Sequence, residues 1–126
     1  HMHLLGKNMH MFVTFPDGST RDLIRIDDWD FNWQSQYYFQ EPIDLPKGSV
    51  VHAVAHFDNS DHPRNPHHPP RLVTWGPSST DEMLVGYIGV VKKGQDLTRS
   101  GEEDDLFQIL ARQYFRKVNR ERFARR

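Results

Sequence analysis

The sequence predicts an all-β protein, a jelly-roll-like β-sandwich followed by one C-terminal amphipathic helix. Short β-rich stretches separated by turn residues fill the first 91 residues, and several of them alternate apolar and polar side chains. From residue 102 onward the apolar residues recur at helical spacing instead. We therefore expect a sandwich domain at 1–91, a linker at 92–101 and a helix at 102–126.

The first two strands are predicted at residues 9–15 and 21–26. Pro16, Asp17 and Gly18 lie between them. Proline presets φ for a turn and glycine accepts the left-handed conformation, so this tripeptide is typical of a tight connection. We expect the two strands to pair as a hairpin.

Residues 29–39 carry the clearest period-two alternation in the chain. Its aromatic residues are Trp29, Phe31, Trp33, Tyr37 and Phe39. This pattern predicts a strand whose aromatic face is buried in the sandwich. A platform on which sugar rings stack is the alternative for the same face, and burial is the favoured interpretation.

A further strand is predicted at residues 50–58, with two faces of different character. The apolar face carries Val51, Ala53, Ala55 and Phe57. The polar face carries His52, His56 and Asp58. The proline-rich segment 59–70 that follows is expected to be a solvated, partly polyproline-like loop.

Two more strands are expected at residues 72–75 and 83–91. Gly86 and Gly89 lie inside the second of them and predict a bulge or a close backbone approach.

The predicted helix begins with a capping box, because Glu103 follows Ser100 by three positions. Its apolar stripe consists of Leu106, Phe107, Leu110, Tyr114 and Val118. Acidic residues lie in its first turn and basic residues accumulate toward its end, as the helix dipole favours. Dipole compensation explains the basic end better than contact with nucleic acid or an acidic partner.

The composition excludes several classes of function. The formal net charge of −1 gives no general attraction for nucleic acid or for an anionic membrane. The absence of cysteine removes disulfides, thiolate zinc sites and thiol nucleophiles. No apolar run is long enough to span a membrane, and there is no signal peptide. The chain opens on what resembles the middle of a strand, so we expect it to be part of a longer protein.

Eight histidines are many for 126 residues, and two of them open the chain. In an extended segment His1 and His3 lie on one face, with Cα atoms roughly 6.6 Å apart, so both rings can reach one metal ion. A thioether such as that of Met83 would complete a set that suits copper, because soft sulfur favours Cu(I). The alternative is an apolar Met83 in the core and two solvated histidines.

Two segments carry a family resemblance. Residues 1–7, His-Met-His-Leu-Leu-Gly-Lys, and residues 79–83, Ser-Thr-Asp-Glu-Met, resemble segments of the copper type II, ascorbate-dependent monooxygenases. This is the family of the peptidylglycine α-hydroxylating and dopamine β-monooxygenases. The similarity is to the C-terminal catalytic-copper domain and covers roughly residues 1–91. Segments 30–33, 45–48 and 56–60 look more like bacterial relatives.

The resemblance implies a role for particular residues. His1, His3 and Met83 would hold the copper at which dioxygen is activated, with ascorbate or another reductant as electron source. Tyr87 would help to bind substrate, as a tyrosine there anchors the carboxylate of peptide substrates in that family. Val85 stands where the peptide-hydroxylating members have asparagine, so peptidyl-glycine is not the expected substrate. The resemblance also implies an extracytoplasmic location, periplasmic or secreted.

The family's chemistry needs a second copper on an upstream domain that this chain has no room for. We therefore expect little coupled hydroxylation by the chain alone, and a missing copper domain or fused redox module as its partner. His52 and His56 are a less favoured second metal site, because they are roughly 13 Å apart in a regular strand. His62, His67 and His68 are expected to be solvated loop residues.

Three alternatives remain open at this point. The first alternative is a non-catalytic module that binds a protein partner or a glycan and has a vestigial site. The second is a domain for copper handling or electron transfer. A free α-amino group at His1 would also offer an amine chelate or a histidine brace.

Overall fold

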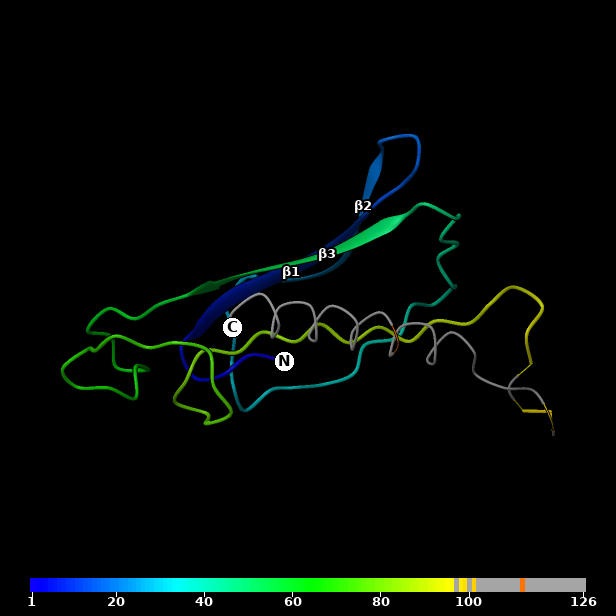
Figure 1. Ribbon diagram of the computed structural model, residues 1–126. Coiled ribbons are helices and arrows are strands. Elements are labelled where there is room, and N and C mark those ends of the chain that lie inside the picture. The colour runs from blue at the N-terminus through cyan, green and yellow to red at the C-terminus, as the bar shows by residue number, and fades with distance from the viewer. Residues whose placement is uncertain (97, 100, 102–111, 113–126) are drawn as a thin grey trace, which may run out of the picture. The chain divides into compact units, whose positions relative to one another are not determined.

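A computed structural model of the chain describes residues 1–96, 98, 99, 101 and 112. The chain divides into two compact units, His1–Tyr87 and Ile88–Arg126. The first unit contains three strands, β1 (Gly6–Thr14), β2 (Thr20–Ile26) and β3 (Val50–Phe57). They form one antiparallel sheet in the order β2-β1-β3 (Figure 1). The β-rich class predicted from the sequence is confirmed, and all three strands lie where strands were expected.

The predicted hairpin joins β1 to β2. The N–H of Gly18 donates to the carbonyl of Phe15, and the N–H of Phe15 donates to the carbonyl of Ser19. Gly18 has a φ of 85°, the left-handed region in which a side chain would be strained. One residue of β2 is bulged where Met11 pairs with Ile24 and Phe12 with Asp22. The bulge adds twist to this end of the sheet.

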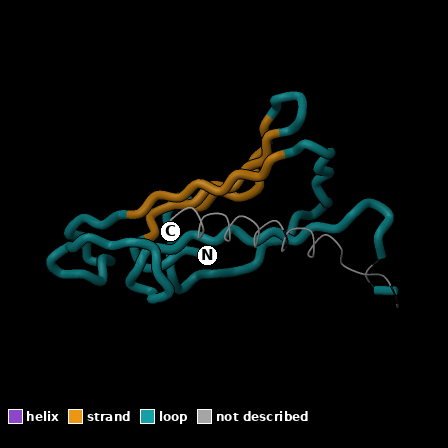
Figure 2. Tube along the Cα trace, in the orientation of Figure 1, coloured by secondary structure: helices purple, strands orange, loops and turns teal. Residues whose placement is uncertain are grey.

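The three strands run side by side (Figure 2), and β1 is the central one. The side chains of β1 alternate between the two faces of the sheet. Met9, Met11 and Val13 are buried, whereas the residues between them are half-buried. The core contains Met2, Met9, Met11 and Trp29, and it is flanked by partly buried apolar residues of β2 and β3 and by Leu84. The core therefore lies on one face of the sheet only.

Three of the four residues predicted on the apolar face of β3 pack as expected, whereas Ala53 is exposed. Val51, Ala55 and Phe57 pack against the core. His52 is on the opposite face, where its ring stacks on Phe12 of β1 at 4.6 Å between centroids.

The strand predicted at residues 29–39 is wrong, since this segment forms no strand. Trp29 is buried, and its main-chain N–H donates to the carbonyl of Lys7. Immediately afterwards the carboxylate of Asp30 accepts from the N–H of Asn32, which turns the chain out of an extended course. Trp33 and Tyr37 are 69% and 59% exposed, so the aromatic face is not buried.

The strands predicted at residues 72–75 and 83–91 are also not formed as such. Trp75 and Glu82 make an isolated bridge, and Met2 and Leu84 make another. The only ladder partner of this second stretch in the described part of the chain is the short segment at residues 1–3, so pairing ends at Val85. Alternation alone cannot extend a strand that lacks a neighbour to accept its hydrogen bonds.

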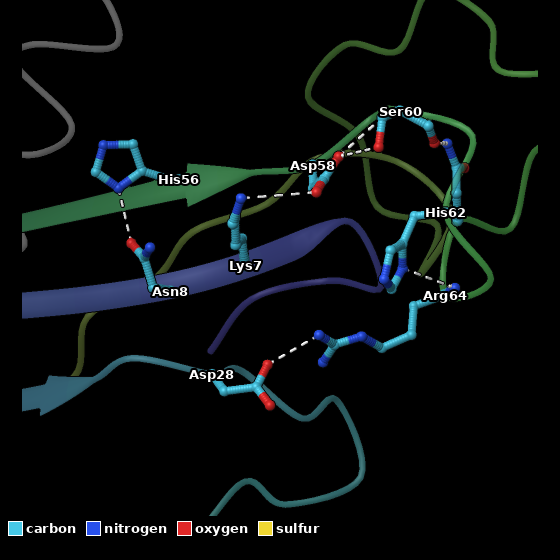
Figure 3. A network of polar contacts seen from close by, with 9 residues as sticks. Lys7, Asn8, Asp28, His56, Asp58, Ser60, His62 and Arg64 are labelled. Carbon is cyan, nitrogen blue, oxygen red and sulfur yellow. Dashed lines mark hydrogen bonds and ion pairs between the residues drawn. The ribbon is translucent and has the colours of Figure 1, made fainter.

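The loop at residues 58–70, called here the histidine–proline loop, is largely exposed, as expected, but it contains one buried residue and several side-chain contacts. Asn65 is buried, with 3% of its surface exposed. Figure 3 shows the loop tied to the rest of the unit by two ion pairs, Lys7 with Asp58 and Arg64 with Asp28. Side chains thus fix the loop against the start of β1 and the segment after β2.

The helix predicted at residues 102–126 lies outside the described residues apart from position 112. The jelly-roll arrangement also stays a prediction, because the described strands form a single sheet. Over the residues that the structure describes, there is no helix with the length and hydropathy needed to cross a membrane.

Candidate metal centre

Residues 1–3 and 83–85 form a short antiparallel ladder. The amine of His1 donates to the carbonyl of Val85, and the main-chain N–H of Val85 donates to the carbonyl of His1, each at 2.8 Å. Met2 bridges Leu84, and the N–H of His3 donates to the carbonyl of Met83 at 3.3 Å. His3 is therefore directly opposite Met83 in the ladder.

The register assigns side chains to the two faces of this ladder. Met2 is fully buried, and Leu84 opposite it packs against the core. Because neighbours along a strand point to opposite faces and cross-strand partners share a face, the register assigns His1, His3 and Met83 to the face opposite to Met2 and Leu84. The register sets the main chains of His3 and Met83 opposite each other, although the two residues are far apart in the sequence.

The two imidazole rings lie edge to face, with centroids 5.1 Å apart and planes at 82°. His3 is 95% buried, as only 5% of its surface is exposed. Its Nδ1 lies 3.2 Å from the carbonyl oxygen of Asp81. A carbonyl can only accept, so Nδ1 is the protonated nitrogen of His3 and Nε2 carries the free lone pair.

The same tautomer follows for His1. Its Nδ1 hydrogen-bonds to Oε1 of Gln34. The amide of Gln34 cannot be turned round, because its Nε2 donates to the carbonyl of Phe31 at 2.6 Å. Nδ1 of His1 therefore donates, and Nε2 is left available. A hydrogen bond on the other ring nitrogen is the usual arrangement for a histidine that binds metal.

The amino group of His1 occupies the end of the ladder, where it donates to the carbonyl of Val85. Partial burial lowers its pKa from the ordinary value of 8.0, because the charged form loses solvation. An amine chelate or a histidine brace would need the lone pair of this nitrogen at the metal. In the ladder this nitrogen donates to the carbonyl of Val85, a bond that leaves the lone pair of the neutral amine unused.

The remaining histidines do not converge on a second site. His52 hydrogen-bonds to the hydroxyl of Thr14 at 3.1 Å, and His56 to the side-chain oxygen of Asn8 at 2.7 Å. Each ring is thus engaged by a different residue of β1. Within the described residues, no three side chains drawn from His, Cys, Asp and Glu form a group that could hold a metal ion. The His1, His3 and Met83 set relies on a thioether and is of a different kind.

Tyr87 lies two residues beyond Val85, and 79% of it is exposed. It is accessible for contact with a substrate, as its predicted role requires.

Three residues near the candidate centre were not predicted from the sequence: Gln34, Asp81 and His67. Gln34 lies in the aromatic segment, and Asp81 acts through its carbonyl, which every residue has. His67 donates from Nε2 to the carbonyl of Thr80 at 2.9 Å. The sequence around His67 gives no indication of this contact, since it shows only that His67 is one of the histidines of the histidine–proline loop.

No protein-family model, curated protein or solved structure is significantly similar to the chain.

Proposed function

We propose that the chain is a copper-binding domain in which His1, His3 and Met83 form a mononuclear site. The observation that carries the proposal is the ladder register, which sets Met83 opposite His3 on the face that His1 also occupies. Both histidines use Nδ1 in hydrogen bonds to oxygen acceptors, so both Nε2 atoms are available as ligands. Two imidazoles and a thioether suit copper better than zinc or magnesium, because the soft sulfur favours Cu(I).

The proposed activity is that of the O₂-activating half of a C–H hydroxylating monooxygenase within a larger redox protein. Copper, when bound, supplies one-electron redox chemistry that can support hydrogen abstraction from a C–H bond. The chain's own residues hold the ion and present Tyr87 for substrate contact. The electrons come from ascorbate or another reductant, through an upstream copper domain or a fused redox module. A jelly-roll sandwich in an extracytoplasmic protein is the setting that we propose.

Copper titration tests the site with two isosteric substitutions. Met83→Leu keeps an apolar side chain of similar volume and removes the sulfur. We expect Cu(I) affinity, measured by competition with a chromophoric chelator, to fall by at least about 10- to 100-fold, the loss typical of damage to a metal site. Met11→Leu is the control, because Met11 is a buried methionine of β1. Equal affinities of the wild type and Met83→Leu would refute the assignment.

A non-catalytic binding module with a vestigial site is the second candidate. It is favoured by the exposure of Trp33 and Tyr37, whose side chains are joined by a 3.2 Å hydrogen bond from the indole N–H to the phenol oxygen. Such a pair could stack on a glycan or contact a protein partner. Metal analysis of the purified protein separates the two candidates. Stoichiometric copper supports the metal centre, and metal-free protein that binds glycans through Trp33 supports the module.

A further inference from the structure

The segment that carries Met83 is held by a continuous series of hydrogen bonds to its main-chain carbonyls. Main-chain N–H groups hold three of them: Leu4 donates to Ser79, Gly76 to Glu82, and His3 to Met83. The carbonyls of Thr80 and Asp81, which lie between those of Ser79 and Glu82 in the chain, accept hydrogen bonds from side chains. His67 Nε2 donates to Thr80 at 2.9 Å, and His3 Nδ1 donates to Asp81 at 3.2 Å.

Two histidines thus bind adjacent carbonyls, and only one of them is a candidate metal ligand. The carbonyl of Asp81 fixes the tautomer of His3, so its position decides whether Nε2 faces the metal. The adjacent carbonyl of Thr80 belongs to the same short stretch of chain, and His67 holds it. A displacement of the stretch would move the acceptor of His3 and the thioether of Met83 together.

His67 is itself held in place by a buried side chain. Its main-chain N–H donates to Oδ1 of Asn65 at 2.8 Å. The side-chain Nδ2 of Asn65 donates in turn to Oδ1 of Asn59 at 3.0 Å and to the carbonyl of Ser60 at 2.8 Å. With 3% exposure, Asn65 makes these bonds with little competition from water. The histidine–proline loop therefore presents the ring of His67 from a fixed base.

From this series of contacts we infer that His67 is a positioning residue of the copper site. It does not bind the ion, but it holds the Thr80–Met83 segment so that the thioether and the tautomer of His3 are set before metal arrives. The inference rests on the proposed function for its effect on copper. The mechanical part, that His67 restrains the ladder of residues 1–3 with 83–85, stands independently of copper.

The copper arm of the test uses His67→Ala and His67→Gln. The alanine variant should bind Cu(I) about 10- to 100-fold more weakly than the wild type, the usual loss when a residue outside the ligand set is removed. Its X-ray absorption spectrum should retain the Cu–N contribution and lose intensity in the Cu–S contribution. Glutamine carries an amide N–H donor at similar reach and should restore much of both signals. His62→Ala is the control, because His62 lies in the same loop and accepts from the N–H of Arg64.

The second arm uses metal-free protein and measures amide hydrogen exchange. His67→Ala should speed exchange at the amides of His3 and Leu4, whose acceptors are the carbonyls of Met83 and Ser79. His62→Ala should leave both rates unchanged. If the wild type binds no Cu(I), the proposed function is overturned. The exchange rates still show whether His67 restrains the ladder of residues 1–3 with 83–85. Unchanged exchange in His67→Ala overturns the restraint, and faster exchange with unchanged Cu(I) affinity overturns its role in the copper site.

Discussion

At the scale of single residues, the carboxylate of Asp58 shows how a local hydrogen bond changes the charge state of a site. Oδ1 accepts from the hydroxyl of Ser60 at 2.6 Å and from its N–H at 3.0 Å. These bonds favour the ionised form and hold the pKa of Asp58 below its ordinary value of 3.8, with a smaller contribution from the charge of Lys7. The same carboxylate pairs with Lys7 and so links the end of β3 to the start of β1.

Replacing Ser60 by alanine should raise the pKa of Asp58 toward its ordinary value, because the strongest stabilising bond of the ionised form is removed. A depressed folded-state pKa contributes stability above the unfolded pKa, and this contribution is lost as pH falls through the folded pKa. Ser60→Ala should therefore lower the Tm relative to the wild type near neutral pH, and the difference should vanish in strong acid. A carboxyl NMR titration measures the pKa directly.

Ser49→Ala is the control for this titration, because the hydroxyl of Ser49 donates to the carbonyl of Pro46 and not to a carboxylate. An Asp58 pKa that is the same in Ser60→Ala and the wild type would contradict the assignment.

The arrangement of the candidate ligand residues was partly predictable. The spacing of His1 and His3 requires them to share a face of any extended segment, and the structure shows them so. Their tautomers could not be predicted, because the acceptors come from Gln34 and Asp81, at separations of 33 and 78 residues. Contacts over such separations depend on how loops pack, and no periodicity in the sequence encodes them.

At the scale of elements, β1 contributes most to the fold because it pairs on both sides and carries the core residues Met9, Met11 and Val13. Its first residue is confined. A Cβ built on Gly6 would lie 2.8 Å from Cε of Met2, 2.8 Å from Cδ1 of Trp29 and 3.0 Å from the carbonyl oxygen of His3. The start of the central strand therefore touches both the core and the segment that carries the candidate ligands.

Gly6→Ala should destabilise the domain by about 1–3 kcal/mol, the usual cost of inserting a methyl group into filled space. The thioether of Met2 can move, but the indole of Trp29 and the carbonyl of His3 leave little room. Urea denaturation followed by circular dichroism measures the change. The matched variant is Gly89→Ala, since a Cβ at Gly89 meets nothing within 4 Å. A Gly6→Ala protein as stable as the wild type would show that the core accommodates the methyl group.

The elements divide into those that sequence periodicity predicts and those that it cannot. β1, β2 and β3 were predictable because each has alternation, turn residues at its ends and a neighbour to pair with. Residues 29–39 have alternation that is as clear, yet Asp30 turns the chain and most of the aromatic side chains stay exposed. Alternation shows that the two faces of a segment differ in polarity. A segment forms a strand only if a neighbouring strand also pairs with its main-chain N–H and C=O groups.

At the scale of the molecule, the first unit has a small core and many exposed apolar side chains. Few residues are fully buried, and the sheet covers the core on one side only. A domain with limited burial gains a large fraction of its stability from anything that binds the folded state. Copper bound between residues 1–3 and Met83 would cross-link the two segments that close this unit.

We therefore expect copper to raise the stability of the whole unit. At a free Cu(I) concentration 100 times the Kd, binding adds about 2.7 kcal/mol to the free energy of unfolding. Differential scanning calorimetry should show a higher Tm under anaerobic, reducing conditions, and a Cu(I) chelator should reverse the shift. Met83→Leu should show a smaller shift at the same copper concentration, because a 10-fold loss of affinity leaves about 1.4 kcal/mol and a 100-fold loss about 0.4 kcal/mol of this stabilisation. A shift of equal size in both proteins would place the binding elsewhere.

The ladder of residues 1–3 with 83–85 has a further consequence for chain length. Met2 and Leu84 pack against the core, and the ladder register assigns His1, His3 and Met83 to the opposite face. One inserted residue directly before Met83 would exchange the two faces, so that Met83 takes the core-facing position and Leu84 moves to the face of the imidazoles. Two inserted residues would restore the phase. Natural or engineered variants of this segment should therefore differ in length by even numbers.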